Sequence, residues 1–216
     1  MKTIPDPLCA MVDVDAAARA GWRPVALAQT FLDGGARFLQ LRAKSMAGGP
    51  LLETAAAIVE RARPCGATVI VNDRADIARL AAADGVHVGQ DDLTPAAIRM
   101  LVGASAIVGL STHTVDQIER AVREPVSYVA IGPVFATATK ATGYDRVGLD
   151  MVRQAAARAT AAGLPLVAIG GITIETARSV IDAGAASVAV IADLLAGGDP
   201  TRRTREFLQV LRSDLR

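Results

Sequence analysis

The sequence has few aromatic residues and no excess charge of either sign, and each shortage excludes a class of protein. Phe, Trp and Tyr make up 3% of the 216 residues, whereas hydrophobic residues of all kinds make up 51%. The core must therefore be built mainly from Ala, Val, Leu and Ile, which suits closely packed strands and helices. The net charge is +1, from 23 Lys and Arg against 22 Asp and Glu. This balance argues against a general nucleic-acid or membrane-surface binder.

Cysteines and long apolar runs are also scarce. Cys9 and Cys65 stand in no metal-binding or Cys-x-x-Cys spacing, which favours reduced thiols. No apolar run approaches the roughly 18 residues that indicate a transmembrane helix. The first residues, MKTIPDPLCAMVDVDAA, contain too many acids and too short an apolar run for a secretory signal. We therefore expect a cytoplasmic protein without nucleic-acid or membrane partners; the sequence leaves open whether it forms a homo-oligomer.

What the sequence does contain is a repeated alternation of short apolar runs with Ala-rich helical patterns. Strands alternating with helices indicate right-handed βαβ units and a parallel sheet. Eight such units favour a closed (β/α)8 TIM barrel, here one domain over residues 1–216, with an open doubly wound sheet as the alternative. The predicted strands are 8–12, 37–43, 67–71, 85–89, 106–110, 127–131, 165–169 and 186–190. The predicted helices are 23–34, 50–62, 75–83, 94–101, 115–123, 148–162, 174–183 and 201–213.

In a TIM barrel the chemistry is assembled where the strands end. In QLRAK, at the end of the second strand, alternation places Gln40, Arg42 and Lys44 on one face, which we expect to point into the barrel mouth. The local sequence offers no anion for the two cations. They are either solvated charges at a strand end or a binding site for a phosphorylated substrate.

Two acidic corners follow the third and fourth strands, in VNDRAD and GVHVGQDD. Asp73 alone is typical of a helix N-cap, and Asp91 or Asp92 could cap the helix that starts near TPAA. Neighbouring strands lie about 4.8 Å apart, however, so Asp73 and Asp92 could converge on one cation. Two carboxylates beside a phosphate-seeking cluster suggest Mg²⁺.

The later corners combine hydroxyls, glycines and one long connection. Ser111 near His113 invites a hydrolase interpretation, but no Gly-x-Ser-x-Gly elbow is present. The longest connection, 132–148, is typical of a functional loop and offers phosphate ligands. Gly170 and Gly171 let backbone amides approach a ligand closely. The sequence thus predicts a cationic site suited to a pyrophosphate and a backbone-rich site suited to a monophosphate.

Taken in order, the segments QLRAK, VNDRADIA, ADGVHVGQDD, GLSTHT, GPVFATATK, AIGGI and SVAVI resemble those of thiamine-phosphate synthases. The resemblance implies a TIM-barrel transferase that joins hydroxymethylpyrimidine pyrophosphate to thiazole phosphate, giving thiamine phosphate and pyrophosphate. It also implies a dissociative mechanism, in which a pyrimidine-methyl cation forms before the thiazole nitrogen attacks.

The resemblance also implies roles for particular residues. Asp73 and Asp92 would bind Mg²⁺. The pyrophosphate contacts would be Arg42, Lys44, Asn72 and Lys140. Gln40 and His87 would line the pyrimidine pocket, with Ser111 near the reacting centre. The thiazole phosphate would be bound by Thr137, Thr139, Gly171 and the backbone at Ile191 and Ala192. The residues implied in catalysis are Ser111, Lys140 and Arg42.

Two positions depart from the family pattern, and two rival functions stay open. Cys9 stands where a tyrosine is common, and Ala192-Asp193-Leu194 replaces a Ser-Ala-Ile run. A thiazole tautomerase on the same barrel would use a histidine, for which His113 is available, to move a proton. Against it stand the acidic corner at Asp92 and the intact TATK segment. The other rival is a non-catalytic phosphate-ligand-binding barrel, which the complete metal and cation set disfavours.

Overall fold

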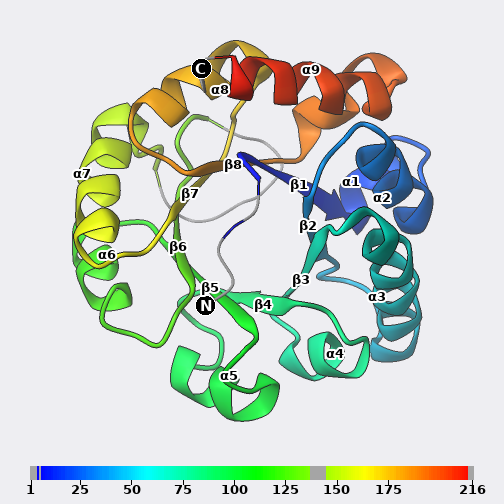
Figure 1. Ribbon diagram of the computed structural model, residues 1–216, viewed down its shortest axis with the longest axis horizontal. Coiled ribbons are helices and arrows are strands. Elements are labelled where there is room, and N and C mark those ends of the chain that lie inside the picture. Colours follow the sequence, from blue (N-terminus) through cyan, green and yellow to red (C-terminus); the bar gives the residue numbers. More distant parts are fainter. Residues whose placement is uncertain (1–3, 5, 137–144, 214–216) are drawn as a thin grey trace.

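The computed structural model describes residue 4 and residues 6–136 and 145–213. Eight parallel strands form a closed barrel in the order β1 to β8 (Figure 1). The predicted residues Thr137, Thr139 and Lys140 lie outside the described part of the chain. The strands are β1 (Leu8–Asp13), β2 (Phe38–Arg42), β3 (Thr68–Asn72), β4 (Gly85–Val88), β5 (Ile107–Thr112), β6 (Tyr128–Ile131), β7 (Leu166–Ile169) and β8 (Ser187–Val190).

The predicted TIM barrel is confirmed, and each predicted strand overlaps an observed one. The barrel closes where β1 pairs with β8, with Leu8 opposite Val188, so the open doubly wound sheet is excluded. Side chains alternate between its two faces, as in β4, where Val86 and Val88 belong to the core between strands and helices. The intervening His87 faces the barrel interior and is 7% exposed.

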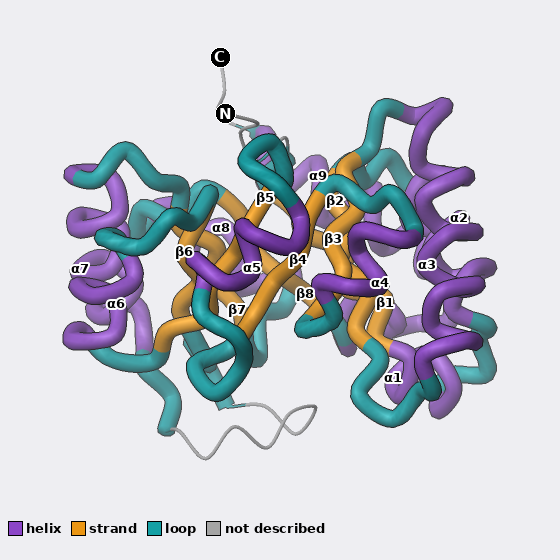
Figure 2. Tube along the Cα trace, turned by 90° about the horizontal axis from the view of Figure 1, so that it is seen from below, coloured by secondary structure: helices purple, strands orange, loops and turns teal. Residues whose placement is uncertain are grey.

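The helices surround the barrel, as the views in Figure 1 and Figure 2 agree. The sequence pattern did not predict α1, a short helix that begins directly after β1. Its N-cap is Asp13, whose carboxylate accepts a hydrogen bond from the Ala16 N–H at 2.8 Å. The helices are α1 (Val14–Arg19), α2 (Pro24–Asp33), α3 (Gly48–Ala62), α4 (Ala75–Leu80), α5 (Pro95–Val102), α6 (Val115–Ala121), α7 (Gly148–Ala161), α8 (Ile174–Asp182) and α9 (Pro200–Arg212), with short 3-10 segments η1 (Arg63–Cys65) and η2 (Ala192–Gly198).

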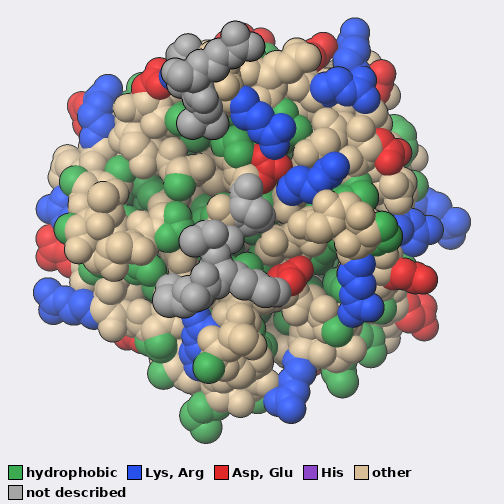
Figure 3. All heavy atoms as spheres, viewed as in Figure 1, with side chains coloured by type: hydrophobic (Ala, Val, Ile, Leu, Met, Phe, Trp, Pro, Cys, Tyr) green, Lys and Arg blue, Asp and Glu red, His purple; other side chains and the backbone are tan. Residues whose placement is uncertain are grey.

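The amino-terminal end of the barrel is closed by contacts between the beginning and the end of the chain. The buried Asp6 carboxylate accepts a hydrogen bond from the Arg37 N–H at 2.8 Å and pairs with Arg212 of α9 at 3.0 Å. Burial raises the pKa of Asp6, against the effect of these partners. On the face in Figure 3, acidic and basic side chains are interspersed around the rim. Within the described residues, no helix is both long and apolar enough to cross a membrane.

Candidate active site

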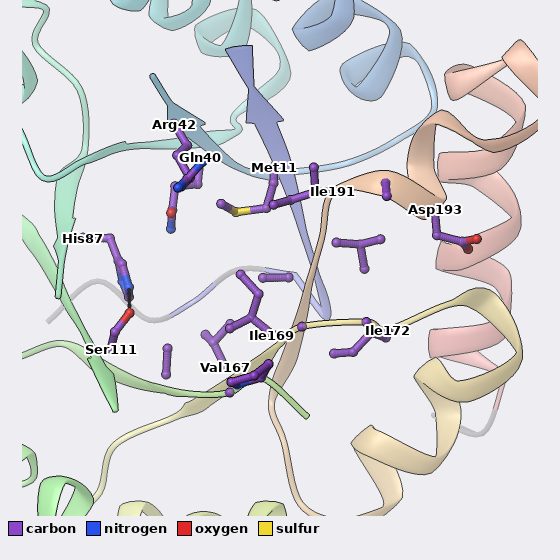
Figure 4. Close-up of a pocket in the computed structure, with 18 of the residues that line it drawn as sticks. Met11, Gln40, Arg42, His87, Ser111, Val167, Ile169, Ile172, Ile191 and Asp193 are labelled. Carbon is purple, nitrogen blue, oxygen red and sulfur yellow. Dashed lines mark hydrogen bonds between the residues drawn. The ribbon is translucent and has the colours of Figure 1, made fainter. Parts of the chain in front are cut away.

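A cavity of about 420 Å³ opens at the carboxyl ends of the strands. In Figure 4, Gln40 and Arg42 of β2 lie on one side of it, and Val167 and Ile169 of β7 on another. This is the mouth of the barrel, where enzymes of this fold place their chemistry. Of the predicted site residues, the cavity lining includes Gln40, Arg42, Asn72, His87, Ser111, Gly171, Ile191 and Ala192.

A row of hydrogen-bonded side chains crosses the floor of this cavity. His87 Nε2 lies 2.8 Å from Ser111 Oγ, and His87 Nδ1 lies 2.8 Å from the Tyr128 hydroxyl. The buried Gln40 side chain of β2 lines the same cavity. Adjacent strands β4, β5 and β6 bring His87, Ser111 and Tyr128 together, because all three occupy inward positions. The structure thus places Gln40, His87 and Ser111, which the family resemblance assigned to the pyrimidine pocket and the reacting centre, along one cavity.

Tyr128 is a site residue that the sequence pattern did not reveal. It is 1% exposed, its ring stacks on His87 with centroids 5.4 Å apart, and it meets Phe38 edge-on at 6.2 Å. Burial raises the pKa of the Tyr128 phenol well above its ordinary value, so the hydroxyl keeps its proton. The segment SYVAI looks like an ordinary apolar strand. The usable signal was that position 128 shares the inward face of its strand with Ala130.

The cations at the end of β2 have anionic partners, which the local sequence does not supply. Arg42 Nη1 lies 2.5 Å from Asp13 Oδ2, and Lys44 Nζ lies 2.5 Å from Asp73 Oδ2. The partners come from the ends of neighbouring strands rather than from the local sequence. Asp13 and Arg42 are register partners of β1 and β2. These contacts orient both cations, while Lys44 stays about half exposed.

The two predicted metal ligands follow β3 and β4. Asp73 has a φ of 62° and its N–H donates to the His87 carbonyl at 2.7 Å. It is not a helix cap, because the N-cap of α4 is Arg74. Asp92 Oδ2 accepts from the Gly89 N–H at 2.7 Å, which turns its carboxylate back toward the end of β4. Neither it nor Asp91 caps α5.

Thr94 caps α5 instead, because its hydroxyl accepts from the Ala97 N–H at 3.3 Å. Across the described ranges, no group of three or more His, Cys, Asp or Glu side chains could hold a metal ion. Mg²⁺ does not require such a group, since it is commonly bound by one or two carboxylates together with substrate phosphates and water. Asp73 and Asp92 offer hard oxygen donors of that kind, outside the residues that line the cavity. One oxygen of each is already engaged, by Lys44 and by the Gly89 N–H respectively, which leaves the other oxygen of each carboxylate for a metal.

The opposite side of the cavity is formed by backbone. Gly170 and Gly171 have φ values of 105° and 64°, which residues other than glycine rarely adopt. A Cβ added to Gly171 would lie closer than 3.0 Å to the Ala136 carbonyl. Gly171 therefore has both a conformational and a steric reason to be glycine, and the chain can pass close to a ligand here.

The acid in the departing Ala192-Asp193-Leu194 segment lies at the edge of the cavity lining, with its carboxylate turned outward (Figure 4). Asp193 Oδ2 accepts from the Ile174 N–H at 3.0 Å and pairs with Arg203 of α9 at 2.8 Å. Figure 4 shows its carboxylate pointing outward from the cavity. The substitution therefore adds no unpaired negative charge to the backbone-rich side.

The other departure, Cys9, packs in the inner core beneath the cavity. It is 1% exposed, its Sγ lies 4.0 Å from Met11 Sδ, and burial raises the pKa of its thiol. Met11, rather than Cys9, belongs to the cavity lining. Cys9 therefore contributes to the inner core and does not line the cavity.

His113, the second histidine, occupies a different environment from His87. Its Nδ1 lies 2.5 Å from the Gly132 carbonyl oxygen, and its backbone N–H donates to Gln117 at 2.7 Å. A carbonyl can only accept, so Nδ1 of His113 carries the hydrogen. The histidine hydrogen-bonded to Ser111 is His87, which means that Ser111 and His113 do not form the pair expected of a hydrolase.

The fold and the cavity define a class of protein: a (β/α)8-barrel enzyme with a small-molecule site at the carboxyl ends of its strands. The chain belongs to the thiamine monophosphate synthase family, whose model matches residues 12–194. This agrees with the resemblance of the seven sequence segments.

Individual relatives cover most of the chain. It is 50% identical over 186 residues to the thiamine-phosphate synthase of Koribacter versatilis, across 86% of this chain and 85% of the relative. The thiamine-phosphate synthase of Chlorobium luteolum is 41% identical over 204 residues, which cover 94% of this chain and 92% of the relative. Among solved structures, the thiamine phosphate pyrophosphorylase from Pyrococcus furiosus matches with a TM-score of 0.86 at 26% identity, covering 97% of this chain and 96% of that one.

Proposed function

We propose that this protein catalyses the Mg²⁺-dependent coupling of hydroxymethylpyrimidine pyrophosphate with thiazole phosphate, giving thiamine phosphate and pyrophosphate. The observation that carries the proposal is one cavity with two unlike sides. Arg42 of the charged side and Gly171 of the backbone-rich side both line it. A pyrophosphate fits the first side and a monophosphate the second.

The charged side would bind and neutralise the leaving group. Arg42, Lys44 and Asn72 would contact the pyrophosphate, together with Lys140, which lies outside the described residues. The ion pairs with Asp13 and Asp73 hold the two cations in place before the substrate arrives. Asp73 and Asp92 would hold Mg²⁺, which would neutralise part of the charge on the departing pyrophosphate.

The floor of the cavity would bind the pyrimidine ring. Gln40 and His87 would contact the ring, and Ser111 would lie near the reacting carbon. We propose a dissociative reaction, in which pyrophosphate leaves first and the thiazole nitrogen attacks the resulting pyrimidine-methyl cation. Such a reaction needs no protein nucleophile, and its main demand is stabilisation of charge.

The backbone-rich side would bind the phosphate of the thiazole. Amides at Gly171, Ile191 and Ala192 would donate to its oxygens, with Thr137 and Thr139 of the undescribed segment completing the site. Backbone amides hold phosphate without a net charge. That suits a site next to a cationic intermediate, because extra positive charge there would oppose its formation.

We also propose that the barrel is one domain and that the protein is cytoplasmic; a homo-oligomer is possible. The free Cys9 and Cys65 thiols support the cytoplasmic location. Size-exclusion chromatography with light scattering would decide the oligomeric state.

A product assay tests the function. Purified protein with Mg²⁺ and both substrates should form thiamine phosphate and pyrophosphate. Product formation should stop when EDTA removes the metal. The same protein given thiazole carboxylate phosphate tests the tautomerase alternative, in which His113 would move the proton. Isomerisation without coupling would contradict the proposal, and binding of both substrates without either reaction would favour the non-catalytic barrel.

A further inference from the structure

The hydrogen-bonded row Tyr128, His87 and Ser111 has a direction that follows from its donors and acceptors. The buried Tyr128 hydroxyl keeps its proton, because burial raises the pKa of the phenol. The single proton of the Tyr128 hydroxyl can then be donated to His87 Nδ1, 2.8 Å away. Nδ1 of a neutral imidazole that accepts this bond carries no proton, so Nε2 carries it.

The direction continues to the cavity. His87 Nε2–H donates to Ser111 Oγ at 2.8 Å, so the Ser111 proton is not needed for His87. Ser111 lines the cavity, and its carbonyl accepts a hydrogen bond from the Gln90 side chain at 2.6 Å, which fixes the end of the strand. The Ser111 hydroxyl is therefore free to donate its proton to a hydrogen-bond acceptor on the ligand.

Gly109 makes this arrangement sterically possible. It is the register partner of Tyr128 on β5. A Cβ at position 109 would lie closer than 3.0 Å to the Tyr128 ring, to its hydroxyl and to His87 Nδ1. Because Tyr128 is buried against Phe38, its ring has little room to move aside. Because Gly109 has no side chain, there is room for the hydrogen bond between Tyr128 and His87.

We propose that Tyr128 and Gly109 are positioning residues: they hold His87 as the Nε2–H tautomer, so that Ser111 presents a proton donor to the ligand. The role in turnover rests on the proposed synthase function, whereas the tautomer itself does not. Neither residue touches the reacting atoms in this scheme; both act through His87 and Ser111.

The tautomer can be measured in the ligand-free protein. The chain has only two histidines, so long-range ¹H–¹⁵N spectra of ¹⁵N-histidine-labelled protein show two rings, which His113→Gln assigns. The spectra are recorded at a pH at which their own ¹⁵N shifts show both rings to be neutral. We expect Nε2–H for His87 and Nδ1–H for His113, which donates to Gly132. Nδ1–H at His87 would overturn the proposal without any need for a variant.

Tyr128→Phe removes the donor while keeping the ring. We expect His87 to gain Nδ1–H, with the Ser111 proton turned toward Nε2. The value of kcat/KM should then fall about tenfold, the size of one hydrogen bond. A double-mutant cycle separates this from a structural effect. Once Ser111 is replaced by Ala, adding Tyr128→Phe should lower kcat/KM by no more than about twofold further, because both residues act through the same hydroxyl.

Thr204→Val is the matched control, since it removes a buried hydroxyl that donates to Pro200 in α9. It should lower the melting temperature without changing the His87 tautomer. An unchanged tautomer in Tyr128→Phe, or fully additive losses with Ser111→Ala, would refute the positioning role. If wild-type protein makes no thiamine phosphate, the proposed function fails, while the wild-type spectra still decide the tautomer.

Discussion

On the side of β1 to β4 the mouth of the barrel presents charged side chains, whereas on the side of β7 and β8 it presents backbone and small or apolar groups. The charged side contains two ion pairs, Arg42 with Asp13 and Lys44 with Asp73. On the other side, the acid Asp193 is paired with Arg203 and directed outward. Gly170 and Gly171 bring the main chain to the cavity there.

The difference shows two ways of preparing a cavity for anions. Charged groups attract strongly, but they need partners that hold them in place while no ligand is bound. Backbone amides need no partner of opposite charge, but they need a main-chain conformation that only glycine adopts easily. Substitutions on the two sides should therefore fail in different ways, and the following predictions test this.

The largest effect is expected on the charged side, from Asp92→Asn. Replacing a carboxylate that would hold Mg²⁺ should cost several kcal/mol of leaving-group stabilisation, so kcat should fall about 100-fold or more. Steady-state assays over a range of Mg²⁺ concentrations measure it. Asp91→Asn is the matched control, one residue away and also exposed. Equal losses in the two variants would mean that the metal ligand is wrongly assigned or that both acids bind.

On the backbone side, Gly171→Ala should raise KM for thiazole phosphate about tenfold or more. Its Cβ would approach the Ala136 carbonyl too closely, and the positive φ costs about 1 kcal/mol. KM for the pyrimidine pyrophosphate should change little. Gly163→Ala carries similar backbone strain, with a φ of 70° and open space around the added Cβ. If both glycine variants had the same kinetics, strain alone would explain Gly171.

On the charged side, the sequence predicted the positions of side chains better than their ion-pair partners. Gln40 and Arg42 line the cavity, as strand alternation predicts. His87, which the family resemblance assigned to the pocket, lines it too. The partners of Arg42 and Lys44 were not foreseen, since pairing depends on the register between strands that are distant in sequence. Asp13 stands opposite Arg42 only because β1 and β2 align there.

Other features depended on three-dimensional packing. Tyr128 looked like part of an apolar strand, and its value as a polar group depends on Gly109 leaving room on the neighbouring strand. The eight strands were found because their apolar runs are distinct. Helix α1 was missed because six residues directly after a strand give too short a periodic pattern.

The smallest effect is expected from releasing the acid on the backbone side. Arg203→Gln removes the charge that pairs with Asp193, leaving that carboxylate held by the Ile174 N–H. A carboxylate freer to turn toward the cavity should repel a phosphate, so KM for thiazole phosphate should rise a few-fold. The effect should shrink at high ionic strength, because salt screens exposed charges.

Two variants decide whether charge is the cause. Asp193→Asn added to Arg203→Gln should restore KM, because it removes the repelling group. Arg202→Gln is the neighbouring control, since Arg202 is exposed and pairs with Glu206. If Arg203→Gln leaves KM unchanged, the Ile174 N–H alone suffices to hold Asp193 outward, and the neutrality of this side is fixed by the amino-terminal end of α8 rather than by α9.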